Sequence, residues 1–430
     1  MSQVLFLTLL THLVVVSIVA EESGQIHCRD EKGVAVDWYI GYKFPQLEKD
    51  ARFQSGYAYA YATSDQLQYN QHQKQLKSRN LYSRVIDFFF KNAQRWMKRD
   101  RVSSSLMNNQ SNINKGWTLS KYRIDDPESC VARTLEAAYG TQGESSSVSS
   151  IFYNDQPPAD SSGKIRRSAI KAHAKGIILM DKSGESGLWL THSVPLFPSR
   201  RGTKFQFHEN SRKFGQTFMC ISLDLRQSGK QVVQHLVNMQ PLVYDWKISD
   251  KVRTTIPAVD VLISGKRGNT TPKLAQTITT RGGKSLNLYS KSADFKQDMY
   301  SSWIDGELGT ALFVETWRQG KGTPLNSTCP KDAYHVNNIK DLKYDKSTTW
   351  SYLHDHSKWA ISEEESNGIF CIGDSNRMQS QFKRGGGAVC LRCPSCWSLF
   401  SNTILDIEPC PRNNYNYGNN NNNKSVSINK

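Results

Sequence analysis

The amino-acid sequence predicts a fold of the mixed α/β class. Segments with the pattern of strands alternate with segments of helical pattern along the 430 residues, and such alternation is typical of layered α/β proteins. The second half of the chain repeats the plan of the first half loosely. Each half also contains one His-x-Lys triplet, at His173 and at His356, in a context that favours an ordered structure.

The individual elements follow from hydrophobic periodicity and from the turn residues between the segments. In the first half we expect strands at 33–43, 56–62, 149–153, 176–180, 188–190 and 217–223, and a helix at 131–138. In the second half we expect helices at 226–237 and 298–304, strands at 258–264, 310–317 and 370–372, and a Gly-rich turn at 384–387 that leads into a buried run. The polar segment 64–116 is interpreted as a partly mobile insertion with a helical patch at 81–97.

The first 20 residues are apolar and end in a small residue before two glutamates, which is typical of a secretory signal peptide. Nine cysteines fit the oxidising secretory route, and their odd number leaves at least one thiol unpaired within the chain. The same route agrees with N-x-Ser/Thr sequons at Asn109, Asn269, Asn326 and Asn423. No later stretch approaches the roughly 20 apolar residues of a membrane span. We therefore expect a lysosomal or secreted protein without a membrane span.

The charge of the chain favours an anionic partner. Its 55 basic residues outnumber its 39 acidic residues, which gives a formal net charge of +16. This balance suits nucleic acid or an anionic membrane surface, and charge alone does not choose between them. A basic cluster at 164–167 lies in an expected loop, where we favour a solvated or protease-sensitive segment over a DNA contact.

The two main His-x-Lys triplets differ from a third triplet by their context. His173-Ala174-Lys175 is followed at once by the apolar run 176–180, and an Asp and a Trp flank His356-Ser357-Lys358. His72-Gln73-Lys74 has the same spacing but lies in polar sequence, so we interpret it as a solvated coincidence. In an extended segment, side chains two residues apart leave the same face. A lysine can then hold a phosphate, and two histidines at one phosphate supply a nucleophile and a general acid without a metal.

The sequence predicts neither a metal site nor a cofactor. Cys393 and Cys396 have the spacing of half a zinc site, but the chain lacks a second cysteine pair at zinc-finger spacing. We therefore expect a disulfide or a loop at these two cysteines. His192, His335 and His354 lack a clustered set of acidic partners that would complete a metal site.

The chain resembles the deoxyribonuclease II family, the acid endonucleases of lysosomes. The matches run in the family's order from about Cys28 to Cys410. In the first half they are VDWY at 36–39, YKFP at 42–45, YNDQPP at 153–158, HAKG at 173–176, HSVP at 192–195, FP at 197–198, and FGQT at 214–217 leading to Cys220. In the second half they are LGT at 308–310, DHSKW at 355–359, GD at 373–374, NR at 376–377 and RGGG at 384–387.

This resemblance implies a fold like that of phospholipase D, in which two related α/β halves each contribute one His-x-Lys pair to a shared central cleft. On this basis we expect a signal peptide at 1–20, halves at 21–225 and 226–411, and a disordered Asn-rich tail at 412–430. The family pattern implies the disulfides Cys28–Cys220, Cys329–Cys410 and Cys371–Cys390, and it leaves the pairing of Cys130, Cys393 and Cys396 open. It also implies metal-independent, sequence-nonspecific hydrolysis of double-stranded DNA to 3′-phosphate and 5′-hydroxyl ends.

By the same resemblance, the candidate catalytic residues are His356, His173, Lys358 and Lys175. One neutral histidine would attack phosphorus and form a phosphohistidine, while the other histidine, protonated, gives its proton to the leaving 5′-oxygen. The two lysines would neutralise the phosphate oxygens. Which histidine attacks is open at this point. Because each histidine has a lysine two residues away, we expect lowered histidine pKa values and a bell-shaped activity profile with its alkaline limb below neutrality.

Three supporting residues accompany the triplets. Asp355 is a candidate to fix a histidine tautomer or, alternatively, a surface cap. Ser193 and Asn376 follow the two histidines at the same offset of 20 residues, 193−173 and 376−356, as candidates to bind the phosphate or orient a histidine. Ordinary turn residues are a nearly equal alternative for them. Trp38 and Trp359 are expected in the core rather than stacked on DNA bases.

Two other functions stay open. A phospholipase D-like lipid phosphodiesterase would use the same His-x-Lys pairs, and anionic lipid would also suit the basic charge. The other alternative is an inactive secreted relative that binds nucleic acid or acts as a toxin, against which the intact triplets argue. A homodimer is compatible with the sequence.

Overall fold

The computed structural model describes residues 25–69, 71, 117–139, 148–330 and 333–410. The expected signal peptide, the helical patch at 81–97, the triplet at His72, the sequons at Asn109 and Asn423 and the Asn-rich tail lie outside these residues. The other two sequons are at exposed positions, Asn269 and Asn326, as glycosylation requires. None of the helices in the described part has the length and the apolar composition that crossing a bilayer demands.

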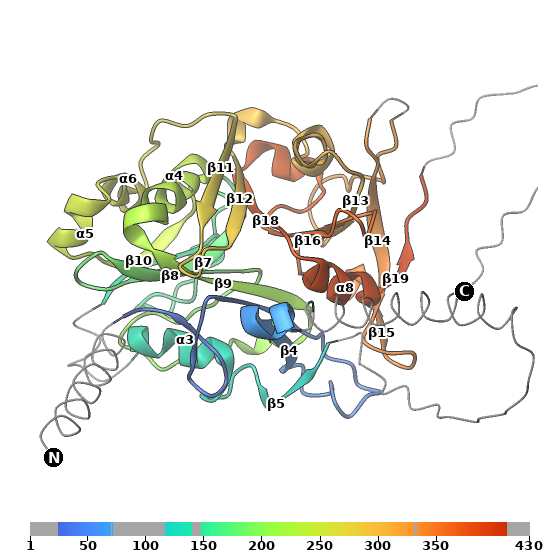
Figure 1. The fold of residues 1–430 in the computed structure, drawn as a ribbon, viewed down its shortest axis with the longest axis horizontal. Helices are drawn as coiled ribbons and strands as arrows, with labels where there is room; N and C mark the ends of the chain where they lie inside the picture. The colour runs from blue at the N-terminus through green and yellow to red at the C-terminus, as the bar shows by residue number, and fades with distance from the viewer. Residues whose placement is uncertain (1–24, 70, 72–116, 140–147, 331–332, 411–430) are drawn as a thin grey trace, which may run out of the picture.

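Two large β-sheets form the centre of the molecule (Figure 1). The first sheet contains β3 (Trp38–Lys43), β4 (Ala58–Thr63), β5 (Leu119–Arg123), β6 (Ser149–Asn154), β7 (Lys175–Met180), β8 (Ser186–His192), β9 (Gln216–Asp224) and β10 (Val243–Lys247). The second sheet contains β11 (Lys273–Thr279), β12 (Ser285–Lys291), β13 (Leu312–Glu315), β14 (Val336–Lys343), β15 (Thr349–Ser351), β16 (Trp359–Ser362), β17 (Ile369–Gly373), β18 (Gly386–Arg392) and β19 (Ile404–Ile407). A small ribbon pairs β1 (Cys28–Arg29) with β2 (Ala35–Val36).

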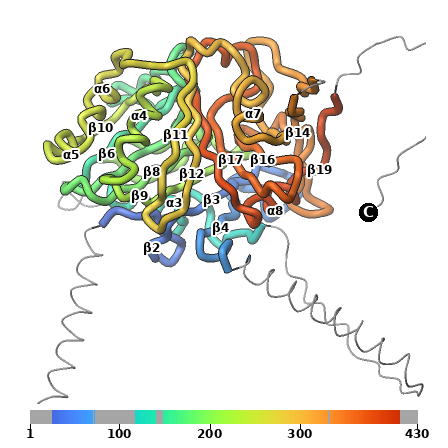
Figure 2. Tube along the Cα trace, turned by 45° about the horizontal axis from the view of Figure 1, so that its top comes forward, coloured from blue at the N-terminus to red at the C-terminus, as the bar shows by residue number. Residues whose placement is uncertain are grey.

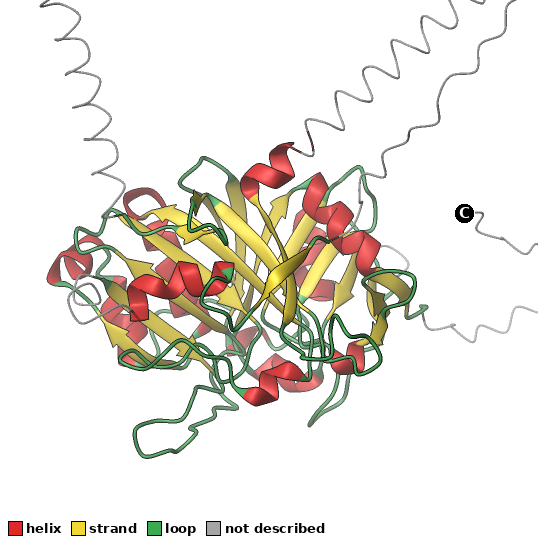
Figure 3. Ribbon diagram, turned by 90° about the horizontal axis from the view of Figure 1, so that it is seen from below, coloured by secondary structure: helices red, strands yellow, loops and turns green. Residues whose placement is uncertain are grey.

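The helices lie outside the sheets, with strands running through the middle of the molecule (Figure 3). They are α3 (Cys130–Tyr139), α4 (Lys230–Met239), α5 (Asp250–Thr255), α6 (Ala258–Ser264), α7 (Asp305–Leu308) and α8 (Pro394–Thr403). Helices α4, α5 and α6 gather at the end of the molecule that also carries β10 and β6 (Figure 2). The expected mixed α/β class is therefore confirmed.

The strand order of the two sheets is closely related. The first sheet has the order β10-β6-β7-β8-β9-β3-β4-β5, and the second has β11-β12-β18-β17-β16-β13-β14-β15, with β19 paired to β14. Both sheets thus contain an antiparallel run of four strands, β6-β7-β8-β9 and β13-β16-β17-β18, followed by one further antiparallel strand, β3 or β12. Strand β10 joins the first sheet although it lies beyond residue 226, so the halves are interleaved at this point.

The hydrophobic core lies between the sheets and takes side chains from both of them. Trp38, Ile40 and Tyr42 of β3 point into this core, whereas Tyr39 points to a second cluster that includes α3. This division follows from the alternation of side chains along a strand. Trp38 and Trp359 are 2% and 0% exposed, so both are core residues as expected. Burying each large apolar side chain stabilises the fold by about 1.5–3 kcal/mol.

One expected element is wrong in type. Residues 258–264 form the helix α6, although their apolar run favours a strand. The buried residues of this run, Val259 and Leu262, are three positions apart, which matches one face of a helix. Pro257 precedes the helix and Gly265 ends it with a positive φ of 65°. These two residues are ordinary start and stop signals of a helix.

The cysteines pair as the family resemblance implies. Disulfides join Cys28 to Cys220, Cys329 to Cys410 and Cys371 to Cys390. A fourth disulfide joins Cys393 to Cys396, which is one of the two alternatives expected for this pair, and Cys130 is a buried free thiol. Cross-links of this kind commonly stabilise a protein by about 2–4 kcal/mol.

Candidate active site

Each histidine triplet immediately precedes or enters a strand, and each is held by a loop from the other sheet. The backbone N–H of His173 donates to the carbonyl oxygen of Gly385 at 3.0 Å. The backbone N–H of His356 donates to the carbonyl oxygen of Gly215 at 2.8 Å. Gly215 and Gly385 stand directly before β9 and β18, which occupy corresponding places in the two sheets. The two histidines are therefore fixed reciprocally across the molecule.

The two triplets share one site, because the ring of His173 bonds to the carbonyl oxygen of Asp374, and the N–H of the preceding Gly373 donates to the carbonyl oxygen of Lys358 at 2.8 Å. Burial lowers the pKa of His173 well below its usual value, and the ammonium groups of Lys175 and Lys358 lower it further. Burial likewise lowers the pKa of His356, with further contributions from Lys358 and Lys175. Each histidine thus lies within the field of the other half's lysine. The structure brings together all four candidate catalytic residues.

The tautomer of His173 is set by one hydrogen bond. Its Nδ1 lies 2.7 Å from the carbonyl oxygen of Asp374. A carbonyl oxygen only accepts, so Nδ1 must carry the proton of this hydrogen bond. In the neutral ring, Nε2 then carries the free electron pair.

The ring of His356 is held by aromatic packing. It stacks on Phe214, with 3.8 Å between ring centroids and 12° between ring planes. The ring of Trp317 lies 4.3 Å away from it, centroid to centroid. Its Nε2 is buried without a hydrogen-bond partner among the described residues. This nitrogen therefore has no partner of its own among these residues.

The two lysines differ in their partners. Lys175 Nζ lies 2.7 Å from Asp155 Oδ1, and the guanidinium of Arg384 lies 2.8 Å from Asp155 Oδ2. Burial alone would raise the pKa of Asp155, but Lys175 and the other nearby cations hold it well below its usual value. Lys358 Nζ donates to the carbonyl oxygen of His356 at 2.5 Å. Burial, followed by the charge of Lys175, lowers the pKa of Lys358 to about 7.

Asp374 is a site residue to which the sequence analysis gave no role. Burial raises the pKa of its carboxyl group to about 7, although Lys175 and Lys358 oppose the shift. Its backbone N–H donates to Gly387 O at 2.9 Å, and the N–H of Ser193 donates to Thr217 O at 3.1 Å. These two bonds are equivalent in the two sheets. Asp374 is therefore the structural counterpart of Ser193, a relation that only the strand pairing reveals.

The equal offset of Ser193 and Asn376 from the histidines does not make them counterparts. Gly176 and Thr191 are cross-strand partners in the first sheet, and Trp359 and Ile372 are the equivalent partners in the second sheet. The sequence separation of the first pair is two residues longer, so the second hairpin is shorter. Ser193 Oγ donates to Gln216 Oε1 at 2.5 Å and accepts from the N–H of Thr217 at 3.0 Å. Asn376 is buried, and its Oδ1 has no hydrogen-bond partner in the described part of the chain.

Asp355 bonds to other groups than a histidine ring. It is fully buried, so it is not a surface cap. Its Oδ2 accepts from the hydroxyl of Tyr42 and from Trp350 Nε1, the latter at 2.7 Å. Its Oδ1 accepts from the N–H of Ser357 at 2.8 Å. The carboxylate therefore anchors the segment that carries His356.

The described residues offer no convincing donor set for a metal ion. One group of potential ligands comes together, Cys329, His335 and Cys410, but its two cysteines form a disulfide and supply no thiolate. His192 accepts from the N–H of Val194 at 3.1 Å. His354 is exposed, on the surface side of the His356 segment.

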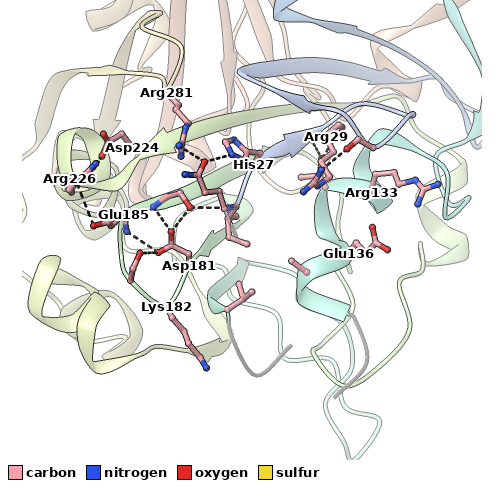
Figure 4. A pocket seen from close by; sticks show the side chains of 18 of the residues that line it. His27, Arg29, Arg133, Glu136, Asp181, Lys182, Glu185, Asp224, Arg226 and Arg281 are labelled. Carbon is pink, nitrogen blue, oxygen red and sulfur yellow. Dashed lines mark hydrogen bonds and ion pairs between the residues drawn. The ribbon is translucent and has the colours of Figure 1, made fainter. Parts of the chain in front are cut away.

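A cavity of about 980 Å³ is lined by His27 and a set of charged side chains (Figure 4). None of the four candidate catalytic residues lines it. Several of its charged side chains have local partners: Asp181 accepts from Ser186, Arg226 pairs with Asp224, and Arg281 donates to Gln25. These contacts give this part of the charged lining a structural role.

Comparison with known proteins agrees with this site. The family model for deoxyribonuclease II matches residues 27–95 and 84–410. Plancitoxin-1 of Acanthaster planci is 28% identical over 412 residues, which cover 95% of this chain and 99% of the relative. Deoxyribonuclease-2-alpha of Mus musculus is 34% identical over 299 residues, covering 69% and 82%. Cell-death-related nuclease 7 of Caenorhabditis elegans is 28% identical over 396 residues, covering 91% and 90%. The chain therefore belongs to the deoxyribonuclease II family of hydrolases.

Proposed function

We propose that this protein is an acid endonuclease that hydrolyses double-stranded DNA without a metal ion and without sequence preference. The observation that carries the proposal is the meeting of two His-x-Lys triplets at one buried site in a member of the deoxyribonuclease II family. The net charge of +16 supports a polyanionic substrate. The two halves, 21–225 and 226–411, would form a phospholipase D-like pair, for which the related strand orders are the support.

In the first step, His173 Nε2 attacks phosphorus and the bond to the 5′-oxygen breaks. The hydrogen bond from Nδ1–H to Asp374 O supports His173 as the nucleophile, because it leaves the electron pair on Nε2. His356 gives its proton to the leaving oxygen, and its unpartnered Nε2 supports this role. The products of the step are a phosphohistidine and a 5′-hydroxyl end.

In the second step, a water molecule attacks the phosphohistidine. Neutral His356 accepts a proton from this water, the bond between phosphorus and His173 Nε2 breaks, and a 3′-phosphate end is released. Lys175 and Lys358 stabilise the charge on the phosphate oxygens in both transition states. They thereby take over the neutralisation for which many other nucleases use a divalent ion.

The acid optimum follows from the lowered pKa values of both histidines. His356 must be protonated and His173 neutral when the first step begins, so the rate falls on both sides of an optimum below neutrality. This optimum suits a lysosome, and the leader sequence at 1–20 supports a lysosomal or secreted destination.

The test is nicking of supercoiled plasmid by the purified protein, from acid to alkaline pH, in excess chelator and with added magnesium. We expect a bell-shaped profile in chelator and ends that polynucleotide kinase labels directly at the 5′-hydroxyl. A neutral optimum that disappears in chelator would refute the proposed mechanism. Hydrolysis of phosphatidylcholine vesicles without cleavage of plasmid would assign the site to lipid phosphodiesters instead.

A further inference from the structure

Two buried lysines outside the catalytic triplets occupy matching places in the two sheets. Lys43 in β3 is 0% exposed and pairs with Gln216 of β9. Lys291 in β12 is 1% exposed and pairs with Gly386 of β18. Each lysine is thus opposite the residue that directly follows Gly215 or Gly385, the two glycines whose carbonyl oxygens bind the catalytic histidines.

Lys43 closes the loop that leads to Gly215. Its Nζ donates to the carbonyl oxygens of Ser211 at 2.6 Å, Arg212 at 3.0 Å and Phe214 at 2.6 Å. These bonds use all three donors of the ammonium group. A buried ammonium without such partners would be strongly unfavourable, so the lysine and the loop fix each other. The same loop supplies the ring of Phe214 that stacks on His356.

Lys291 closes the loop that leads to Gly385 in a similar way. Its Nζ donates to the carbonyl oxygens of Gln381 at 2.9 Å and Arg384 at 2.5 Å. Gly385 then accepts from the backbone N–H of His173. The guanidinium of Arg384 bonds to Asp155, the partner of Lys175. A displacement of this loop would therefore move both members of the first triplet.

We propose that Lys43 and Lys291 are crossed positioning residues for the proposed nuclease reaction. Lys43 lies in the first sheet and sets the position of His356 of the second half. Lys291 lies in the second sheet and sets the position of His173 of the first half. Neither lysine contacts the reacting phosphate, because its ammonium group bonds to carbonyl oxygens of the loop. Both act through a loop whose carbonyl oxygen holds the histidine of the opposite half.

The test uses the full chain with ¹³C-labelled histidine ring carbons and the substitutions Lys43→Met and Lys291→Met. The His173 and His356 signals, among those of 10 histidines, are assigned by their loss in His173→Gln and His356→Gln. Because the face of Phe214 shields the His356 ring, Lys43→Met should move the His356 signal downfield and leave the His173 signal in place. Lys291→Met should move the His173 signal and leave the His356 signal in place.

Activity gives the second readout. Each substitution should lower kcat on plasmid by about 10- to 100-fold, since a small misplacement of a reacting group has effects of that order. KM should change little because the phosphate contacts remain. Lys284→Met is the matched control: Lys284 is partly buried and donates to the carbonyl oxygen of Arg392 at 2.8 Å, away from both loops. This control should change neither signal nor kcat.

Several outcomes would overturn the inference. Folded Lys43→Met or Lys291→Met protein with unchanged histidine signals and kcat would do so, as would a shift confined to the histidine of the lysine's own half. Where a Met variant does not fold, the corresponding Gln variant, which keeps a donor, replaces it. Failure of both to fold beside a folded Lys284→Met control would assign the lysine to fold stability alone. If the wild type does not cleave DNA, the proposed function fails, and the crossed pattern of NMR shifts still decides this inference.

Discussion

The two halves of the active site share a strand order and a triplet, yet their surroundings are different. His173 and Lys175 belong to a polar network in which Asp374 O, Asp155 and Arg384 take part. His356 is held between aromatic rings, and Lys358 bonds to a backbone carbonyl instead of a carboxylate. A similar backbone therefore supports two chemical environments. This asymmetry allows one histidine to be the nucleophile and the other to be the acid.

The strongest test of this asymmetry is removal of each histidine. His173→Ala and His356→Ala should each lower plasmid cleavage by at least about 10³-fold, since one histidine alone lacks either the attacking or the protonating group. His72→Ala should have full activity. The division of roles is checked by trapping labelled phosphate on the protein with an alkaline quench, because phosphohistidine hydrolyses in acid. His356→Ala protein, given a substrate with a good leaving group, should accumulate phosphohistidine at His173. Label on His356 in the His173→Ala protein would reverse the assignment.

Outside the triplets, Gly215→Ala should be the most damaging substitution on the aromatic side of the site. A Cβ at Gly215 would lie 2.4 Å from Asp355 Oδ2, so the anchor of the His356 segment would have to move. We expect kcat to fall by about 100-fold. Gly306→Ala is the control because a Cβ there meets nothing within 4 Å. Equal kcat values for the two variants would show that the anchor at Asp355 does not position His356.

Lys358 should make DNA binding dependent on pH near neutrality. Its pKa of about 7 means that it is cationic below this pH and neutral above it, so a phosphate contact is lost as the pH rises. In inactive His173→Ala protein, Kd for a DNA duplex should increase by up to about tenfold per pH unit above 7. Lys358→Arg should weaken this dependence because arginine stays charged, and the part that remains should come from the carboxyl group of Asp374, whose pKa is also about 7. A Kd that is independent of pH in the lysine protein would place the charge of the site elsewhere.

Asp374→Asn should have the smallest effect at acid pH. The carboxyl group of Asp374 has a raised pKa of about 7, so it is protonated at the pH of the proposed reaction, and asparagine imitates this neutral form. We expect kcat below pH 6 to stay within about threefold of wild type, as for a shape-preserving exchange. A raised carboxyl pKa in the folded state stabilises at low pH and loses that contribution as the pH rises through 7. The thermal stability of Asp374→Asn should therefore exceed that of wild type more at pH 8 than at pH 4.

The sequence predicted the parts of the site that depend on local pattern. The strand beside His173 and the core positions of Trp38 and Trp359 are confirmed. The disulfide Cys371–Cys390, which the family resemblance implied, is also present. Parts that depend on pairing between distant strands were not accessible. Asp374 and the carbonyl oxygens of Gly215 and Gly385 acquire their roles only when two sheets meet. Residues 258–264 are a different case, because Pro257 and Gly265 mark a helix locally and the apolar run alone favoured a strand.

The disulfide between Cys28 and Cys220 has a consequence for the covalent history of the protein. Its two cysteines are 192 positions apart in the sequence, and the exposed loop at 164–167 lies between them. A single cut by a protease anywhere between them would leave two polypeptides joined as one particle. On a gel, such nicked protein would run as one band without reductant and as two bands with it. Both histidine triplets would therefore stay in the same molecule after such a cut.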